Sequence, residues 1–144
     1  NTDPKEIKNV FSSIGIPFVD TTTEPVVRVK DYAGFFRVLY NASYLNREMS
    51  ELALEILSVS EYKNGLVAGV PAGIKVSHKF GERSIVRENG GSKDVQQVQL
   101  HDCGIIYYPK KPYILCIMTR GDDFKIQEQA IQKLSMFVYN QIDK

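Results

Sequence analysis

The residues best suited to chemistry lie in the segment "VSHKFGE", residues 76–82. An alternating pattern from Ile74 predicts a β-strand that ends at Gly81. A lysine separated by one residue from a glycine at the end of a strand, as Lys79 is from Gly81, can hold an anion. The backbone N–H that follows the glycine can point at a reacting carbonyl and stabilise its oxyanion. The segment therefore indicates either the edge of an active site or an ordinary strand end.

The other polar pairs of the sequence are weaker candidates. His101 and Asp102 are neighbours in an apolar β-like run, and because neighbours in a strand point to opposite faces, we do not expect a His-Asp relay. His78 falls on the opposite strand face from Lys79, which favours a structural role. Ser60 and Lys63 form the one Ser-x-x-Lys string, but Asn64-Gly65 follows at once, which is typical of a connector.

Two cysteines, Cys103 and Cys116, lie in apolar runs joined by "YPKKPY". We expect a hairpin that brings them close as buried free thiols. A disulfide would require that the pair share a face and that the Cβ atoms approach to about 4 Å.

The elements that must position these residues are helices first and strands afterwards. Asp3 is a predicted N-cap for a helix from Pro4, Asp31 is a predicted cap for a second helix, and "NREMSELALEILS" (46–58) predicts a third. All three carry apolar stripes at helical spacing. After "NGLVAGVPAG" (64–73) the period changes to two, and "RSIVRENGGSKD" (83–94) reads as a charged hairpin connection between strands.

Two further strands are predicted over 98–108 and 112–120, and a final amphipathic helix begins near Asp123. This order indicates an α+β fold, in which an antiparallel sheet of three strands is packed by a C-terminal helix and preceded by a small helical region. We assign residues 1–66 to the helical portion and residues 67–144 to the sheet with its helix.

The bulk composition excludes several classes of function. The chain has 144 residues, suited to one domain, and a formal net charge of +1, which gives no electrostatic case for a nucleic acid or a membrane surface as partner. No apolar run approaches the roughly 20 residues that a membrane-spanning helix needs.

Taken together, three stretches resemble the serine β-lactamases and D-Ala-D-Ala peptidases, the penicillin-recognising enzymes. Residues 52–81, "LALEILSVSEYKNGLVAGVPAGIKVSHKFG", resemble the segment that leads to the family's Lys-Thr-Gly or Lys-Ser-Gly strand. Residues 101–121 look like its last hairpin, and residues 29–46 resemble the helix entered from its omega loop. The resemblance covers most of the chain, and it implies the C-terminal part of a β-lactamase-like or transpeptidase-like fold, so that the two portions form one incomplete domain.

The resemblance implies acyl transfer, in which a serine attacks a β-lactam or peptide carbonyl. It places substrate binding at Lys79, Phe80 and Gly81, and gives Lys79 and the backbone N–H of Glu82 catalytic roles, the latter in the oxyanion hole. Phe80 stands where the family has Thr or Ser, so a hydroxyl for the substrate carboxylate is missing and Phe80 is expected to be a packing residue. The resemblance implies neither a cofactor nor a metal ion.

Other family features are absent from the sequence or match it only superficially. The sequence contains no Ser-Asp-Asn, and the family needs its Ser-x-x-Lys at the start of a buried helix, so we expect the nucleophilic serine upstream of Asn1 rather than at Ser60. Glu24-Pro25 is superficially like the deacylating Glu-Pro of class A β-lactamases, but the next helix follows too closely, which favours a solvated loop glutamate.

The resemblance also implies a partner for the sheet. In the family, strands from the N-terminal region complete it, and without them "YILCIMTR" would be an exposed apolar edge. We therefore expect either a missing N-terminal segment or a second chain there, a β-lactam or a peptidoglycan stem peptide as ligand, and an extracytoplasmic location. Two alternatives stay open: a catalytically inactive peptidoglycan- or ligand-binding module of the same fold, and an unrelated α+β domain with a chance Lys-x-Gly.

Overall fold

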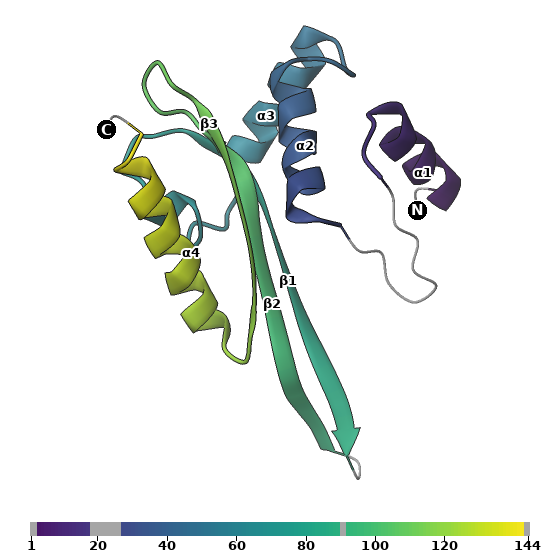
Figure 1. Ribbon diagram of the computed structural model, residues 1–144, viewed down its shortest axis with the longest axis vertical. Helices are drawn as coiled ribbons and strands as arrows, with labels where there is room; N and C mark the ends of the chain where they lie inside the picture. Colours follow the sequence, from purple (N-terminus) through teal and green to yellow (C-terminus); the bar gives the residue numbers. More distant parts are fainter. Residues whose placement is uncertain (1–2, 18–26, 90–91, 143–144) are drawn as a thin grey trace.

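The computed structural model of the protein describes residues 3–17, 27–89 and 92–142. Within them, helices α1, α2 and α3 come first, then a short 3-10 turn, three strands and a last helix (Figure 1). Their bounds are α1 (Pro4–Ser13), α2 (Val29–Tyr40), α3 (Arg47–Ser58), η1 (Val67–Gly69), β1 (Val76–Asn89), β2 (Ser92–Ile106), β3 (Tyr113–Gly121) and α4 (Phe124–Tyr139). The predicted α+β class, with a three-stranded antiparallel sheet, is confirmed.

Short polar side chains begin three of the four helices. Asp3 accepts a hydrogen bond from the Lys5 N–H at 2.9 Å, and Asn46 and Asp123 cap α3 and α4 in the same way. The prediction that Asp31 caps the second helix is wrong, because α2 begins two residues earlier, at Val29. Asp31 lies in the first turn, where its carboxylate accepts a hydrogen bond from Arg28 Nε at 2.6 Å.

The sheet has the order β1-β2-β3, and every neighbouring pair is antiparallel. The predicted strand end at Gly81 and the predicted loop over 83–94 are both wrong. Strands β1 and β2 stay paired from Val76↔Ile106 to Asn89↔Ser92, with one irregularity between Ile85 and Val86. The β-branched residues there favour continued pairing over a loop. Strand β3 reaches only to Val98 of β2, so the β1–β2 hairpin projects beyond it (Figure 1).

Helices cover both faces of the sheet. Helix α4 lies on one side, and α2 and α3 lie on the other (Figure 1). The α4 side holds a buried apolar core of Leu66, Val76, Leu100, Ile106 and Ile131. The α2–α3 side holds a second core of Phe36, Leu54, Cys103 and Ile105. Ser77, on the α2–α3 face, is therefore buried, and its hydroxyl donates to the Leu54 carbonyl at 2.7 Å.

The expectation of free thiols is wrong, since Cys103 and Cys116 form a disulfide. The two residues are direct partners across β2 and β3, with Cα atoms 4.0 Å apart. The Tyr107 N–H donates to the Lys75 carbonyl, so by alternation the backbone of Cys103 is turned toward β1. Cys103 and Cys116 therefore form a non-hydrogen-bonded pair, the type in which facing side chains lie closest.

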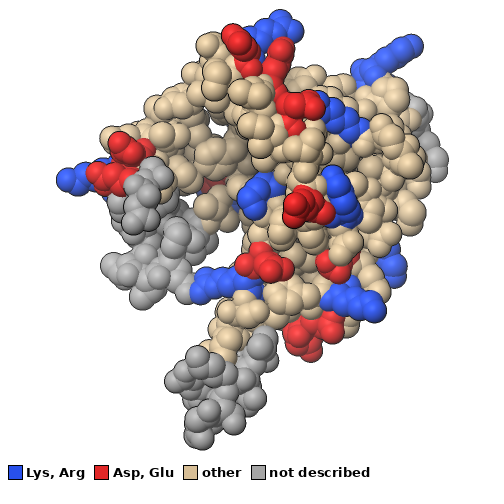
Figure 2. Space-filling view, turned by 180° about the vertical axis from the view of Figure 1, so that it is seen from behind, with Lys and Arg blue, Asp and Glu red and all other residues tan. Residues whose placement is uncertain are grey.

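On the face seen in Figure 2, acidic and basic side chains are interspersed and no large patch of one sign forms. Among the described residues, none of the helices has the length and apolar character needed to cross a membrane.

Candidate active site

The outer edge of β1 carries the predicted site residues. Because the Lys75 carbonyl bonds to β2, the backbone groups of Lys79 and Gly81 also face β2 by alternation. Those of Phe80 and Glu82 then face outward, where no strand pairs with β1 in the described ranges. The Glu82 N–H thus lies on an open strand edge, as an oxyanion donor would require.

Lys79 is exposed at this edge, and its Nζ donates to the Phe80 carbonyl at 2.5 Å. The same nitrogen lies 4.8 Å from the centroid of the Phe80 ring, which adds a cation–π contact. Next to it, an added Cβ at Gly81 would meet no atom within 4 Å. The edge therefore combines a positive charge, an outward backbone and open space.

Phe80 packs, as expected, on the opposite face of the sheet from Lys79. Its ring stacks on Tyr62, with centroids 4.2 Å apart and planes at 20°. The pKa of the Tyr62 phenol is raised, first by burial and then by the charges of Glu128 and Asp102. Position 80 thus contributes an aromatic contact to the fold and offers no hydroxyl to a ligand.

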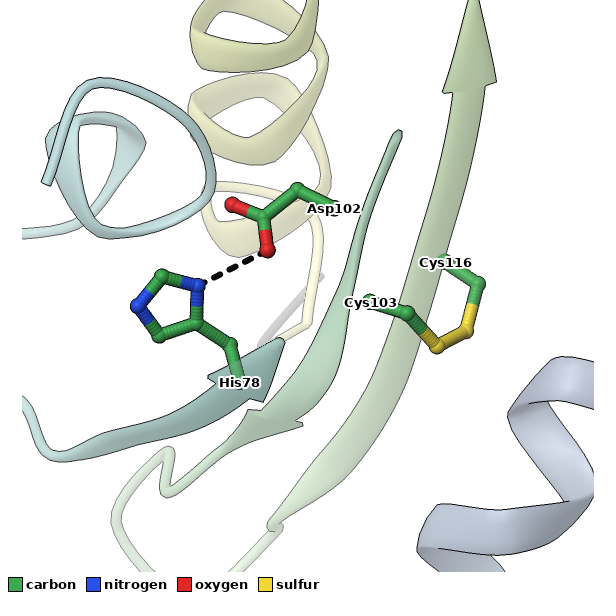
Figure 3. Close-up of a disulfide and its surroundings, with 4 residues drawn as sticks. All are labelled: His78, Asp102, Cys103 and Cys116. Atoms are coloured by element: carbon green, nitrogen blue, oxygen red, sulfur yellow. Dashed lines mark hydrogen bonds and ion pairs between the residues drawn. A yellow bond between two sulfur atoms is a disulfide. The ribbon is translucent and has the colours of Figure 1, made fainter. Parts of the chain in front are cut away.

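A buried polar pair lies on that same face (Figure 3). His78 Nδ1 and Asp102 Oδ1 are 2.8 Å apart, and both side chains are fully buried. The second oxygen, Asp102 Oδ2, accepts a hydrogen bond from the Leu66 N–H at 2.9 Å. An added Cβ at Gly65 would come within 2.3 Å of that oxygen, and one at Gly104 within 2.5 Å of the His78 Cβ. The two glycines therefore make room for the pair, which ties β1 to β2 and to the segment before η1.

Reasoning from the sequence did not find the His78–Asp102 pair. The two residues are 24 positions apart, and they meet only because β1 and β2 pair with His78 opposite Gly104. Asp102 bonds to His78 on the α4 face, whereas its neighbour His101 lies on the α2–α3 face, so the expected absence of a His101–Asp102 relay agrees with the register.

The α2–α3 face beside Lys79 carries the disulfide and His101. Lys79 is directly opposite Cys103, which is in turn opposite Cys116 (Figure 3 shows the bridge). Burial is the main cause that lowers the pKa of His101, and the charge of Arg120 acts in the same direction. A hydrogen bond to the Leu100 backbone opposes this effect.

The other residues that the sequence singled out are not shown at the outer edge of β1. Ser60 and Lys63 lie in an irregular segment between α3 and η1, without the helical turn that would place a serine and a lysine on one face. Glu24 and Pro25 lie outside the described residues. Over the described ranges, no three His, Cys, Asp or Glu side chains gather into a group that could hold a metal ion.

The chain matches a known protein family over most of its length. A model of the β-lactamase enzyme family matches residues 5–142. Among curated proteins, no sequence matches.

Several solved structures share the fold. PBP-A superposes with a TM-score of 0.71 at 18% identity, over 96% of this chain and 51% of that one. A mutant of PBP-A, captured as its acyl-enzyme complex with penicillin G, gives 0.75 at 16% identity, over 96% and 51%. A β-lactamase from Sphaerobacter thermophilus gives 0.74 at 18% identity, over 97% and 55%. The chain therefore spans about half the length of these structures, with their fold.

Proposed function

The chain belongs to the β-lactamase enzyme family, and we propose that it forms the substrate-binding edge of an acyl-serine hydrolase that acts on β-lactams or D-Ala-D-Ala peptides. The observation that carries the proposal is the open edge of β1. There Lys79 is exposed, Gly81 leaves room for a ligand, and the Glu82 N–H faces outward. A carbonyl laid along this edge would meet a backbone donor and a nearby ammonium group.

In the proposed reaction, a serine from a part of the protein upstream of Asn1 attacks the carbonyl carbon. The C–N bond of the amide or lactam breaks, the nitrogen leaves with a proton, and an ester to the serine forms. The Glu82 N–H donates to the carbonyl oxygen as negative charge develops on it. Lys79 holds an anionic group of the substrate and favours the correct protonation of the reacting hydroxyl.

The remainder of the protein is the proposed partner of β3. This strand is an edge of the described sheet, and Ile114 on it is 36% exposed. The chain also spans only about half the length of its solved relatives. We assign the missing strands to an N-terminal segment, with a second chain as the other source, because unpaired apolar edges recruit strands.

The decisive experiment is intact mass spectrometry of the full-length protein after incubation with penicillin G. A hydrolase of this class gains the mass of one opened β-lactam on a serine outside residues 1–144, which peptide mapping locates. A protein that gains no adduct, or that is acylated on Ser60, contradicts the proposal.

One observation favours a second function, a binding module without catalysis. Phe80 stacks on Tyr62 at the position where the enzymes that this sequence resembles carry a hydroxyl. A module of this kind would bind a peptidoglycan stem peptide or a β-lactam reversibly. Binding by calorimetry without a covalent adduct distinguishes it from the hydrolase.

We further propose an extracytoplasmic location. The Cys103–Cys116 disulfide supports it, because such bonds persist mainly in oxidising compartments. Fractionation of the cells that produce the protein tests this, and recovery in the cytosolic fraction contradicts it.

A further inference from the structure

Lys79 lies between two residues whose side chains are held on the opposite face of the sheet. His78 bonds to Asp102 of β2, and the ring of Phe80 stacks on Tyr62. The Lys79 ammonium in turn donates to the Phe80 carbonyl and lies against the Phe80 ring. The position of this ammonium therefore depends on how firmly β1 is held at residues 78 and 80.

One short segment before η1, residues 62–66, holds both of these neighbours, and we call it the clamp segment. At its start, Tyr62 supplies the ring that stacks on β1. At its end, the Leu66 N–H donates to Asp102 Oδ2 at 2.9 Å, while Asp102 Oδ1 lies 2.8 Å from His78 Nδ1. The clamp segment therefore reaches β1 on both sides of the exposed lysine.

The clamp segment is itself fixed to the fold. The Leu66 carbonyl accepts a hydrogen bond from the buried Ser135 hydroxyl of α4 at 2.8 Å. The segment passes close to the buried pair at Gly65, where an added Cβ would lie 2.3 Å from Asp102 Oδ2 and 2.9 Å from Cε1 of Tyr62. A chain of contacts thus runs from α4 through the clamp segment and β2 to β1.

The hydrogen bonds of Asp102 decide which nitrogen of the His78 ring carries a proton. A carboxylate only accepts hydrogen bonds, so Nδ1, the ring atom that faces it, must be the donor (Figure 3). The other ring nitrogen, Nε2, is buried and has no hydrogen-bond partner in the described part of the chain. A proton there would be a buried donor without an acceptor, which is costly. The ring is thus oriented through Nδ1 alone.

We propose that His78 and Asp102 are positioning residues of the reaction, which act through Lys79. With its proton on Nδ1, His78 fixes the backbone of β1 before Lys79, and the stacked Phe80 fixes it after. The ammonium is thereby kept at the outer edge. This inference rests on the proposed function, in which that ammonium holds an anionic group of the substrate. Misplacing a binding group by about 1 Å can cost about 100-fold in rate, so a buried pair behind it affects acylation.

The first test reads the position of the proton and needs no substrate. In a long-range proton–nitrogen NMR spectrum of the full-length protein, Nδ1 of His78 should carry a proton, and the signals lost in His78→Asn identify this ring. In Asp102→Asn, the amide oxygen still accepts from the Leu66 N–H, so the NH2 group faces the ring and Nδ1 should lose its proton. An unprotonated Nδ1 in the wild type overturns the proposal.

The second test asks whether the pair acts through Lys79. His78→Leu removes the donor, whereas His78→Asn keeps an amide nitrogen where Nδ1 lies. In the full-length protein, His78→Leu should slow acylation by penicillin G about tenfold to 100-fold, and His78→Asn should stay within about threefold of the wild type. Combined with Lys79→Ala, His78→Leu should cost less than about threefold further, because the effects of residues that act through one another are not additive.

Loss of stability alone would give a different result. Gln127→Leu is the matched control, since it removes buried hydrogen bonds with the Val98 carbonyl and the Thr119 hydroxyl. This control should keep the wild-type acylation rate, with circular dichroism showing that every variant is folded at the assay temperature. Full additivity of His78→Leu and Lys79→Ala overturns the proposal, as does a wild-type rate in His78→Leu.

The outcomes also separate the positioning role from the proposed function. Acylation of the wild type with additive variants overturns the positioning role and leaves the hydrolase standing. Without acylation the hydrolase fails, and the same variants are compared by their affinity for penicillin G in calorimetry. Non-additive losses of affinity then support positioning in a binding module, and additive losses overturn it. A protein that neither reacts nor binds overturns the proposed function and the positioning role together.

Discussion

At the scale of single residues, the proposed chemistry depends on the position of Lys79. Its ammonium lies on an exposed strand edge, against the Phe80 carbonyl and beside the open space at Gly81. The residue before it, His78, and the residue after it, Phe80, point to the opposite face, where they are held by Asp102 and Tyr62. An exposed side chain thus lies between two packed ones, which hold the backbone of Lys79 in place.

Replacing Lys79 by alanine tests the role of this charge. In the full-length protein, Lys79→Ala should slow acylation by penicillin G by the equivalent of about 2.7–4 kcal/mol, the loss typical of one preorganised electrostatic group. The rate constant for adduct formation, followed by mass spectrometry, measures it. Lys125→Ala on exposed α4 is the control and should leave the rate unchanged. Equal rates for Lys79→Ala and the wild type would remove Lys79 from the proposed mechanism.

His101 gives the chain a predictable response to acid. Its pKa in the folded state is lowered from 6.5, chiefly by burial, so the unfolded chain binds a proton on this group more readily. The contribution of His101 to the free energy of unfolding is therefore present above pH 6.5 and is lost as the pH falls toward the folded pKa.

An NMR titration of the histidine ring protons measures this pKa directly. Urea unfolding of His101→Gln should show a smaller loss of stability than the wild type between about pH 7.5 and pH 5.5. A ring that titrates at 6.5 or above would contradict the prediction.

At the scale of secondary-structure elements, β1 and β2 determine the geometry of the site, and two glycines illustrate how. Gly104 lies opposite His78, and an added Cβ would come within 2.5 Å of both the His78 Cβ and the Ser77 carbonyl. Gly104→Ala should therefore cost about 1–3 kcal/mol in unfolding free energy, the range for overpacking. Gly81→Ala is the matched control, because its Cβ enters open space and its backbone is not left-handed. Equal stabilities in urea would show that β1 and β2 can separate to admit the methyl group.

The Cys103–Cys116 disulfide joins β2 to β3 directly. Its partners are 13 residues apart, and closing a loop of this size is worth about 3 kcal/mol in the chain-entropy account. Reduction should lower the urea midpoint of the wild type but not that of a Cys103→Ala, Cys116→Ala double variant. Alkylation of the unreduced, denatured protein should label neither cysteine. Labelling of both would restore the expectation of free thiols.

Elements with strong local signals agreed with the sequence best. Asp3 caps the helix that it was expected to begin, because capping depends on a hydrogen bond within a few residues. The third helix lies within the predicted range 46–58. Asp31 does not cap the second helix: α2 begins at Val29, and Asp31 lies in its first turn in an ion pair with Arg28. The charged run over 83–94 predicted a loop, but most of it is paired strand. Strand pairing depends on residues of the opposite strand, which the composition of one segment cannot reveal.

At the scale of the whole molecule, the chain spans about half the length of the solved structures that share its fold. Strand β3 is an edge of the described sheet, where we propose that further strands pair. The division into portions 1–66 and 67–144 stays a prediction, although α2 and α3 do pack against the sheet.

The proposed function predicts that residues 1–144 by themselves are inactive. Incubated with nitrocefin, they should show neither a burst nor turnover, because the proposal assigns the attacking serine and the strands beside β3 to a part of the protein outside these residues. The full-length protein, prepared in parallel, is the control and should show a burst. A covalent penicillin adduct on the isolated chain would contradict the prediction and would locate a nucleophile within these residues.

The sequence by itself determined the order of helices and strands and the α+β class. These features depend on local periodicity, capping and turn residues, which a chain carries in its neighbouring positions. The tertiary structure alone decided that His78 meets Asp102 and that Cys103 bonds to Cys116. Both depend on the register between strands, and because a shift of one residue would turn each side chain to the other face, only the packed sheet settles them.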